Sequence, residues 1–214
     1  GVRPARLAGH SLGEYTALVA AGALSLKDGA HLVRLRGQLM QEAAPEGTGA
    51  MAAVLGADEA LVKEVCEQAS DSQVVVPANY NSPGQIVIGG DVAAVDRAPS
   101  HTPLMREAGN RLADAIAGLD WHLPERPVVQ NADARIHPTL DGIREALVHQ
   151  LYQPVRWSEC VQVLADAGAR RIGECGPGKV LTGLVKRIDK ALDARALGTP
   201  GDLQAALDDW AVTA

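Results

Sequence analysis

Apolar and polar positions along the chain change repeatedly between a period of two and a period of about 3.6 residues, which is typical of an α/β protein. The helical period predicts helices over the ranges 13–23, 27–44, 58–69, 91–98, 103–117, 140–151, 158–167, 180–192 and from 202 onward. Short apolar runs predict strands over the ranges 6–9, 50–55, 73–79, 85–88, 127–130, 171–175 and 194–197. Strands and helices are therefore expected to alternate along the whole chain.

Residues 50–98 follow a β-α-β-β-α order, which is a ferredoxin-like pattern without its last strand. Within it, Asn81-Ser82-Pro83-Gly84 predicts the turn between two strands. The chain then continues directly into Pro99-Ser100-His101, and this order leaves one sheet edge without a partner. We expect either that the subdomain closes in another way or that residues are missing between Ala98 and Pro99. The second possibility predicts a Cα–Cα distance there well beyond about 3.8 Å.

The composition excludes several classes of protein. With 20 basic and 26 acidic side chains, the chain has a formal charge of −6, so a nucleic-acid partner is not expected. No apolar run approaches the roughly 20 residues of a membrane span, and residues 1–6 lack the apolar core of a signal peptide. The three cysteines show no CxxC spacing, which argues against a zinc site and a disulfide framework. We therefore expect a cytoplasmic protein with free thiols, no metal and no membrane contact.

The sharpest local signal is Gly9-His10-Ser11-Leu12-Gly13, a GxSxG motif between a predicted strand and a predicted helix. We expect the two glycines to permit a tight turn that exposes the Ser11 hydroxyl above the sheet. The following helix places free N–H groups and the positive end of its dipole beside that hydroxyl. The alternative is a serine that only caps the helix. We interpret Ser11 as a nucleophile.

A buried arginine is the second signal. In the helix predicted over 27–44, Arg36 lies in the middle of the apolar stripe, whereas Arg34 points the other way. A guanidinium on an apolar face needs a negative partner. That partner is either a distant Asp or Glu of the chain or the free carboxylate of a substrate, which the guanidinium would hold bidentately.

A serine nucleophile needs a general base, and the chain has six histidines. His101 stands out because it lies in a loop directly before a predicted helix that begins at Pro103 with Thr102 as its cap, and catalytic residues often lie in loops. His10 adjoins Ser11, but neighbouring side chains on such a turn point apart. His101 is therefore the preferred candidate.

A competing motif lies in the second half of the chain, where Gly173 to Lys179 form GxxxxGK after a strand and before a helix, as in a phosphate-binding P-loop. The Ser or Thr that would hold Mg²⁺ is replaced by Val180, and Pro177 removes a backbone donor. Nucleotide binding is therefore an alternative function, beside the simpler interpretation as a tight strand-to-helix turn.

Together these motifs resemble the malonyl-CoA:acyl-carrier-protein transacylase family of fatty-acid synthesis. The matching stretches are collinear and cover residues 9–15, 34–37, 40–43, 47–53, 79–85, 99–101, 150–155 and 176–181. The resemblance implies an α/β-hydrolase-like core, residues 1–46 and 99–214, with an inserted ferredoxin-like subdomain, residues 47–98. It also implies that the chain lacks the family's N-terminal region, whose Gly-Gln-Gly-Ser-Gln loop supplies a second oxyanion donor, and the last ferredoxin-like strand.

The resemblance also implies roles for individual residues. Ser11 would carry the acyl group, and His101 would be its base. The backbone carbonyl of Gln150 would orient that histidine. The backbone N–H of Leu12 would be one oxyanion donor, and Arg36 would bind the malonyl carboxylate.

The implied reaction is a ping-pong transfer of the malonyl group from malonyl-CoA to the phosphopantetheine thiol of an acyl-carrier protein, through a malonyl-Ser11 ester and without a metal or redox cofactor. Acyl-carrier proteins are acidic, so docking needs a local basic patch. Lys186 and Arg187, with Lys190 one turn on, are the candidates, although a solvated helix face is the simpler explanation for any one of them. The nearest alternative is a serine hydrolase or thioesterase in which water replaces the carrier thiol; no acidic triad member is evident for it.

Overall fold

The computed structural model describes residues 3–43, 49–70, 74–91 and 105–211. Its helices and strands, in chain order, are β1 (Leu7–Ala8), α1 (Gly13–Ala20), α2 (Leu26–Ala43), β2 (Gly49–Leu55), α3 (Glu59–Ala69), β3 (Val75–Ser82), β4 (Gln85–Asp91), α4 (Arg106–Ala117), β5 (Val128–Val129), α5 (Leu140–His149), α6 (Trp157–Asp166), β6 (Arg171–Glu174), α7 (Val180–Ile188), β7 (Asp193–Ala196) and α8 (Pro200–Ala211). The mixed α/β class that the alternating pattern predicts is therefore correct.

The turn predicted over residues 81–84 is wrong in its first half. β3 continues through Ser82, and the chain reverses only at Pro83 and Gly84, where Gly84 has a φ of 70°. The reason is the pairing of β3 with β4, in which Ser82 stands opposite Gln85, so the ladder extends to the shortest possible connection. Asn81 consequently lies within the strand.

Other differences are smaller. α7 ends at Ile188 rather than near residue 192, because Asp189 is extended, with φ −142° and ψ 111°. Asp91, expected to begin a helix, is the last residue of β4. The rest of that predicted helix, the Thr102 cap and the Ala98–Pro99 junction lie outside the described residues.

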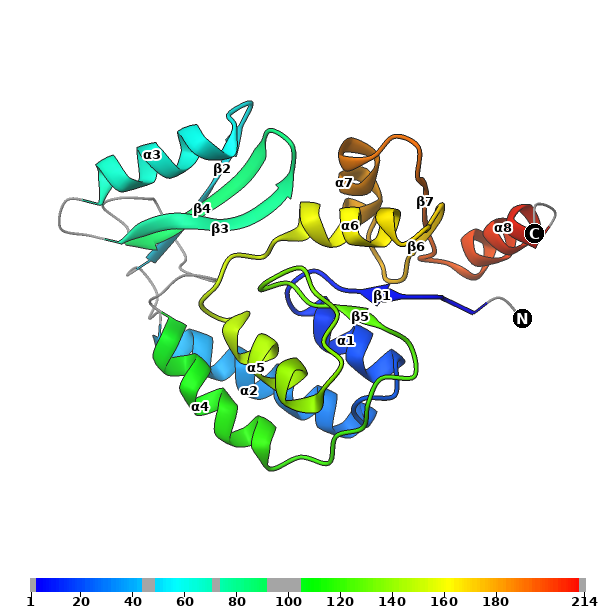
Figure 1. Cartoon of the computed structure of the whole chain (residues 1–214), viewed down its shortest axis with the longest axis horizontal. Helices are drawn as coiled ribbons and strands as arrows, with labels where there is room; N and C mark the ends of the chain where they lie inside the picture. Colours follow the sequence, from blue (N-terminus) through cyan, green and yellow to red (C-terminus); the bar gives the residue numbers. More distant parts are fainter. Residues whose placement is uncertain (1–2, 44–48, 71–73, 92–104, 212–214) are drawn as a thin grey trace.

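Within the described residues the strands form three small sheets. β1 pairs with β5 and β6 pairs with β7, both in parallel, while the third sheet is antiparallel with the order β2-β4-β3. Figure 1 shows α3 lying over the antiparallel sheet at one end of the molecule. It also shows α1, α2, α4 and α5 gathered on one side of β1 and β5, and α6 and α7 on the other. The β1–α1 turn therefore lies where these groups of elements meet.

Each group of elements has its own apolar core. The largest core joins α1, α2, α4 and α5, and its fully buried side chains include Leu18, Leu32 and Leu112. A second core packs α6 and α7 against β5 and β7, with Val129 and Val161 at its centre. The third and smallest core lies between α3 and the antiparallel sheet.

The antiparallel sheet is joined to the rest of the chain at its β3 edge. The Tyr80 N–H donates to the Val155 carbonyl at 2.8 Å, and the Val155 N–H donates to the Ala78 carbonyl at 2.9 Å. Val155, between α5 and α6, thereby forms a parallel bridge with Asn79. This contact holds β3 beside the segment between α5 and α6.

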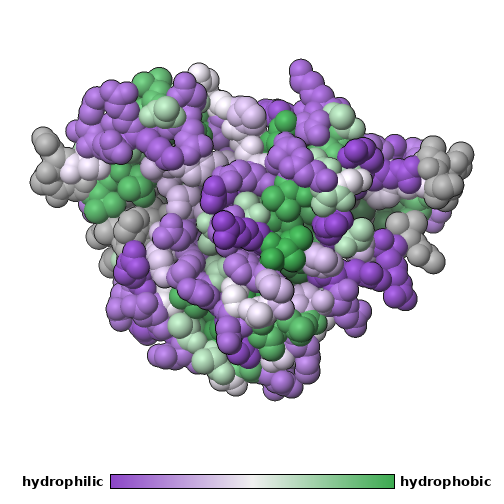
Figure 2. Space-filling model, viewed as in Figure 1, coloured by the Kyte–Doolittle hydropathy of each residue, from purple (hydrophilic) through white to green (hydrophobic). Residues whose placement is uncertain are grey.

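The face of the molecule seen in Figure 2 is mostly polar, with apolar side chains exposed in separate groups. On α3, Leu61 and Val65 are each about half exposed and lie one turn apart. No helix in the described part of the chain is long and apolar enough to cross a membrane.

Candidate active site

The turn between β1 and α1 has the sharp geometry that the GxSxG motif predicts. Ser11 has a φ of 51°, in the left-handed region that costs a non-glycine residue about 1–2 kcal/mol. A Cβ added at Gly9 would lie 1.9 Å from the Gly13 carbonyl oxygen, so only glycine fits there. A Cβ added at Gly13 would have nothing within 4 Å. The expectation that both glycines are needed is therefore wrong for Gly13, because the close approach concerns only the first of them.

The start of α1 leaves a backbone donor beside Ser11. Leu12 precedes the helix in a helical conformation, with φ −55° and ψ −32°. Among the described residues, its N–H has no hydrogen-bond partner. Since the N-terminus of a helix attracts negative charge, this N–H is suited to an oxyanion, as the resemblance implies.

Arg36, from the middle of α2, lies against Ser11. Its Nη2 donates a hydrogen bond to Ser11 Oγ at 2.9 Å, and its side chain is buried, with only 5% of its surface exposed. No carboxylate of the described residues lies within ion-pair distance of it. Burial lowers the pKa of Arg36, while the nearby Tyr15 and Glu14 raise it. The structure thus brings together the two residues that the motif and the apolar stripe single out separately.

Glu14 is a buried residue of this site that the sequence interpretation missed. It lies in the first turn of α1, is fully shielded from solvent, and accepts hydrogen bonds from Gln130, Asn131 and Gln150. Burial raises its pKa to about 7, against the opposing effect of those hydrogen bonds and with a smaller contribution from Asp133. The sequence already indicates that Glu14 is buried, because it stands three and four residues before the apolar Ala17 and Leu18 and so lies on the same face of the helix.

The side chain of Gln150 makes contacts that the sequence did not predict. Its side-chain Nε2 donates to the Ser11 carbonyl at 3.0 Å and to Glu14 at 2.9 Å. The predicted role concerned its backbone carbonyl and His101, and His101 lies outside the described residues. The orientation of the general base therefore stays a prediction, whereas the side chain of Gln150 holds the peptide of Ser11.

His10 points away from Ser11, toward the antiparallel sheet. Its Nε2 lies 2.8 Å from Asn81 Oδ1 of β3, and its ring packs edge-on against Trp157 at 5.5 Å between centroids. Burial lowers the pKa of His10, and the contact with Asn81 partly offsets this effect. A neutral His10 that donates to Asn81 fits these contacts, and it leaves the base role to another residue.

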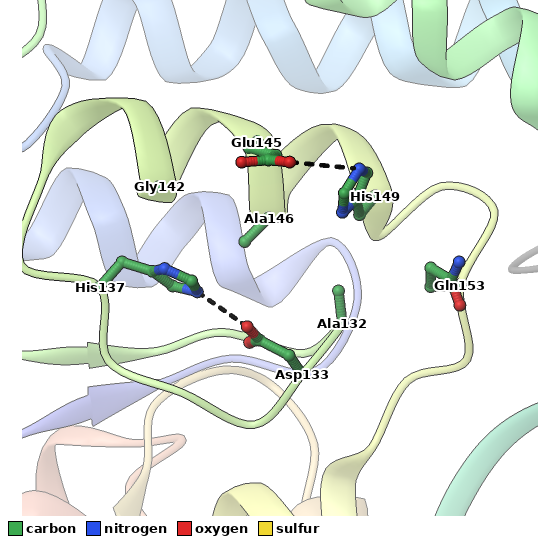
Figure 3. A pocket seen from close by; sticks show the side chains of 8 residues that line it. All are labelled: Ala132, Asp133, His137, Gly142, Glu145, Ala146, His149 and Gln153. Carbon is green, nitrogen blue, oxygen red and sulfur yellow. Dashed lines mark hydrogen bonds and ion pairs between the residues drawn. The ribbon is translucent and has the colours of Figure 1, made fainter.

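Two further histidines line a pocket of about 300 Å³ between α5 and the segment before it (Figure 3). His137 lies 3.0 Å from Asp133, and His149 lies 3.9 Å from Glu145. In Figure 3 each imidazole is directed at its own carboxylate. Among the residues that the structure describes, no group of three or more His, Cys, Asp or Glu side chains is placed to hold a metal ion.

The start of α7, where the P-loop alternative places a phosphate, is occupied by a carboxylate of the chain. Glu174 accepts from the Leu181 N–H at 3.1 Å, the Thr182 N–H at 2.7 Å and the Thr182 hydroxyl at 2.6 Å. A phosphate would need these same donors and would be repelled by Glu174. The GxxxxGK segment is therefore better explained as a structural turn.

The predicted docking residues lie in the last turn of α7. Lys186 and Arg187 are both exposed. Arg187 Nη1 also donates to Gln85 Oε1 of β4 at 2.7 Å, which links α7 to the antiparallel sheet. Their role in binding a partner stays a prediction.

Similar proteins are known at the level of sequence and of structure. Residues 1–122 match the family model described as an acyl transferase domain. The chain is 48% identical to the malonyl CoA-acyl carrier protein transacylase of Escherichia coli (strain K12), over 97% of this chain and 74% of that protein. It is 66% identical to the crystal structure of malonyl-CoA:acyl carrier protein transacylase from Xanthomonas oryzae pv. oryzae, with a TM-score of 0.96 over 98% of this chain and 73% of that one. A malonyl-transacylase in complex with its type II PKS acyl-carrier protein is 44% identical, with a TM-score of 0.95 over 98% and 74% of the two chains.

Proposed function

The chain belongs to the malonyl CoA-acyl carrier protein transacylase family, and from this premise we propose that it transfers a malonyl group from malonyl-CoA to the phosphopantetheine thiol of an acyl-carrier protein through a malonyl-Ser11 ester. The observation that carries the proposal is the hydrogen bond from the buried Arg36 to Ser11 Oγ. A positive charge beside the nucleophile suits an acyl group that ends in a carboxylate.

The chemical steps follow from this arrangement. Ser11 Oγ attacks the thioester carbon and loses its proton to His101, and the Leu12 N–H stabilises the resulting oxyanion. The C–S bond then breaks, and the coenzyme A thiolate leaves with the proton from His101. The carrier thiol reverses these steps on the malonyl-Ser11 ester. No metal or redox cofactor takes part in the proposed reaction.

Arg36 gives the site its preference among acyl groups. In a malonyl-Ser11 ester the free carboxylate is separated from the ester carbon by a single CH₂, so it lies within reach of a guanidinium that already contacts Oγ. An acetyl group leaves the buried charge without that partner. The site therefore favours acyl groups with a terminal carboxylate.

We also propose the finer organisation of the fold on the basis of the family. Residues 1–46 and 99–214 form the α/β-hydrolase-like core, and residues 47–98 form the ferredoxin-like subdomain. The parallel β1–β5 pair before the nucleophile and the β2-β4-β3 sheet beneath α3 support this division. The alignment with the Escherichia coli relative spans 227 positions and this chain has 214 residues, so at least 13 positions of that relative have no counterpart within the aligned part of this chain. Lys186 and Arg187 are the proposed contacts for the acidic carrier, and the cytoplasm is the proposed location.

Intact-mass analysis of the full-length protein after mixing with malonyl-CoA tests the function. We expect a malonyl adduct that Ser11→Ala abolishes and that holo acyl-carrier protein removes by accepting the group. Release of free malonate without a carrier would instead indicate a hydrolase. Absence of any adduct on the wild-type protein would overturn the proposal.

The selectivity is tested by Arg36→Ala, with Arg34→Ala on the exposed face of the same helix as the control. Loss of the ion pair with the malonyl carboxylate should slow malonyl loading by at least about 30-fold, or about 2 kcal/mol, while acetyl loading is maintained or improved. Arg34→Ala should load both groups as the wild type does. Normal malonyl loading by Arg36→Ala would contradict the role of Arg36.

A further inference from the structure

Glu14 is a buried carboxyl group to which the proposed transfer reaction gives no role. No part of it is exposed, and it accepts from Gln130 Nε2 at 3.2 Å, the Asn131 N–H at 2.8 Å and Gln150 Nε2 at 2.9 Å. All three partners are donors, so the two oxygens of Glu14 serve as acceptors. A carboxylate matches such surroundings better than any neutral side chain of the same size.

The orientation of the neighbouring amides is set by the backbone. Gln130 Nε2 also donates to the Ile143 carbonyl at 2.9 Å, and Gln150 Nε2 also donates to the Ser11 carbonyl at 3.0 Å. Each of these amide nitrogens therefore faces a carbonyl oxygen and cannot exchange places with its own oxygen without losing that bond. The donors that converge on Glu14 are consequently fixed as donors.

Two of these partners also hold the peptide groups of the nucleophile. The Ser11 N–H donates to Asn131 Oδ1 at 2.7 Å, and the Ser11 carbonyl accepts from Gln150 Nε2. Asn131 Nδ2 donates in turn to the Gly9 carbonyl at 2.9 Å. The peptide units before and after Ser11 are thus both tied to residues that Glu14 orients.

We propose that Glu14 is a positioning residue for the nucleophile: its carboxylate fixes Asn131 and Gln150, and these two residues hold Ser11 in its left-handed conformation, with Oγ directed at Arg36. The inference rests on the proposed function, since it concerns the serine that carries the acyl group. It adds a residue of α1 that touches neither substrate nor reacting atoms.

The cost of burying this carboxyl supports a role beyond stability. Burial raises its pKa to about 7, and an apolar side chain would avoid the cost of desolvation. The three donors and the N-terminal end of α1 oppose this effect, and the carboxyl is ionised above about pH 7. What the charge provides is a fixed conformation at Ser11, whose φ of 51° is strained without such support.

The test is the rate at which malonyl-CoA and acetyl-CoA acylate Ser11 in Glu14→Gln, measured by rapid quench and intact mass. The glutamine places an N–H₂ group against at least one donor, so the network loosens. A displacement of the nucleophile costs up to about 100-fold, so we expect a 10- to 100-fold slower acylation by both substrates, with their ratio unchanged. Glu107→Gln, which removes the same charge from the exposed first turn of α4, should acylate at the wild-type rate.

A second variant covers the case in which Glu14→Gln does not fold. Gln130→Met removes one donor to Glu14 without touching Ser11, and we expect a smaller loss in the same direction for both substrates. Wild-type acylation by a folded Glu14→Gln, or by Gln130→Met where only that variant folds, would overturn the inference. A loss confined to malonyl-CoA would also overturn it, because it would indicate an effect through Arg36. Absence of an adduct on the wild-type protein is a different result and would reject the proposed function itself.

Discussion

Two turns of this chain follow the same pattern, and only one of them forms a site. Residues 9–13 and residues 173–179 both connect a short parallel strand to a helix through glycines, at β1–α1 and at β6–α7 (Figure 1). In the second turn, Glu174 accepts from the N–H groups of Leu181 and Thr182 and so occupies the start of α7. In the first, the acidic residue is Glu14, which faces buried amides, and no group of the described residues accepts from the N–H of Leu12.

The two turns differ in what the carboxylate of the chain binds: the N–H groups of the following helix in one turn, and donors from other segments in the other. A helix N-terminus that accepts its own acidic side chain is satisfied and has no donor left for a ligand. Backbone strain follows the same division. In the second turn the residue with a positive φ is a glycine, Gly176, at 148°. In the first turn it is Ser11, at 51°. Glycine patterns therefore locate turns of this kind, and the placement of the acid decides whether a turn can do chemistry.

The largest expected effect comes from Gly9→Ala at the first turn. The added Cβ would lie 1.9 Å from the Gly13 carbonyl oxygen, so the turn cannot form without backbone movement. We expect a loss of more than about 4 kcal/mol in the free energy of unfolding, measured by urea denaturation, together with loss of acylation. Gly13→Ala, whose Cβ meets nothing within 4 Å, is the control and should lose little stability. Equal stability of the two variants would contradict the close approach.

The second prediction concerns how pH acts on Glu14. Its pKa is about 7 in the folded chain, against an ordinary value of 4.5 for a glutamate carboxyl, so the folded state binds more protons between these two values. The free energy of unfolding therefore falls as pH rises through this window, by about 3 kcal/mol in total from this one group. The ionisable groups that face Glu14 in the described residues are Tyr15 on α1, Arg36 on α2, Asp133 after β5 and Cys160 on α6.

Urea unfolding of the wild type and of Glu14→Gln across pH 4.5 to 7 (the span set by these two pKa values) measures this effect. Contributions of all other groups are common to both proteins, so the difference between the two curves isolates Glu14. We expect that difference to change by about 3 kcal/mol, with the wild type losing stability relative to the variant as pH rises. Two parallel curves would show that Glu14 titrates as an ordinary carboxyl.

The third prediction applies to the other turn. Glu174→Ala removes the acceptor for the first N–H groups of α7, and loss of such a cap costs about 1–2 kcal/mol. Because this turn has no part in the proposed reaction, acylation of Ser11 and transfer to the carrier should not change. A thermal melt and the intact-mass assay measure both quantities on one sample. Slower acylation by a folded Glu174→Ala would mean that the two turns are coupled.

The sequence predicted the parts of this comparison that depend on local pattern. The 3.6-residue period places Arg36 on the buried face of α2, and the glycines around Ser11 mark the turn, so both residues were found before their contact was known. The contact itself, 2.9 Å between Nη2 and Oγ, needed the fold. Periodicity states which face is buried but not which buried groups meet.

The amide network around Glu14 was not predictable in this way. Gln130, Asn131 and Gln150 reach α1 from positions more than 100 residues further along the chain, and no spacing rule connects them to it. The antiparallel sheet shows the same limit. Ser82 is a turn residue by composition, yet strand pairing with Gln85 keeps it in β3. Long-range partners override local preference at both places.

The smallest expected effect separates strain from chemistry at Ser11. Ser11→Ala and Ser11→Gly both remove the hydroxyl and should both abolish the adduct. They differ in the backbone, because alanine keeps the cost of a φ of 51° and glycine does not. After the extra entropy that glycine loses on folding is deducted, Ser11→Gly should be about 1 kcal/mol more stable than Ser11→Ala in urea. If alanine is instead the more stable, the β1–α1 turn relaxes once the hydroxyl is gone, and the contacts of Asn131 and Gln150 are too weak to hold it.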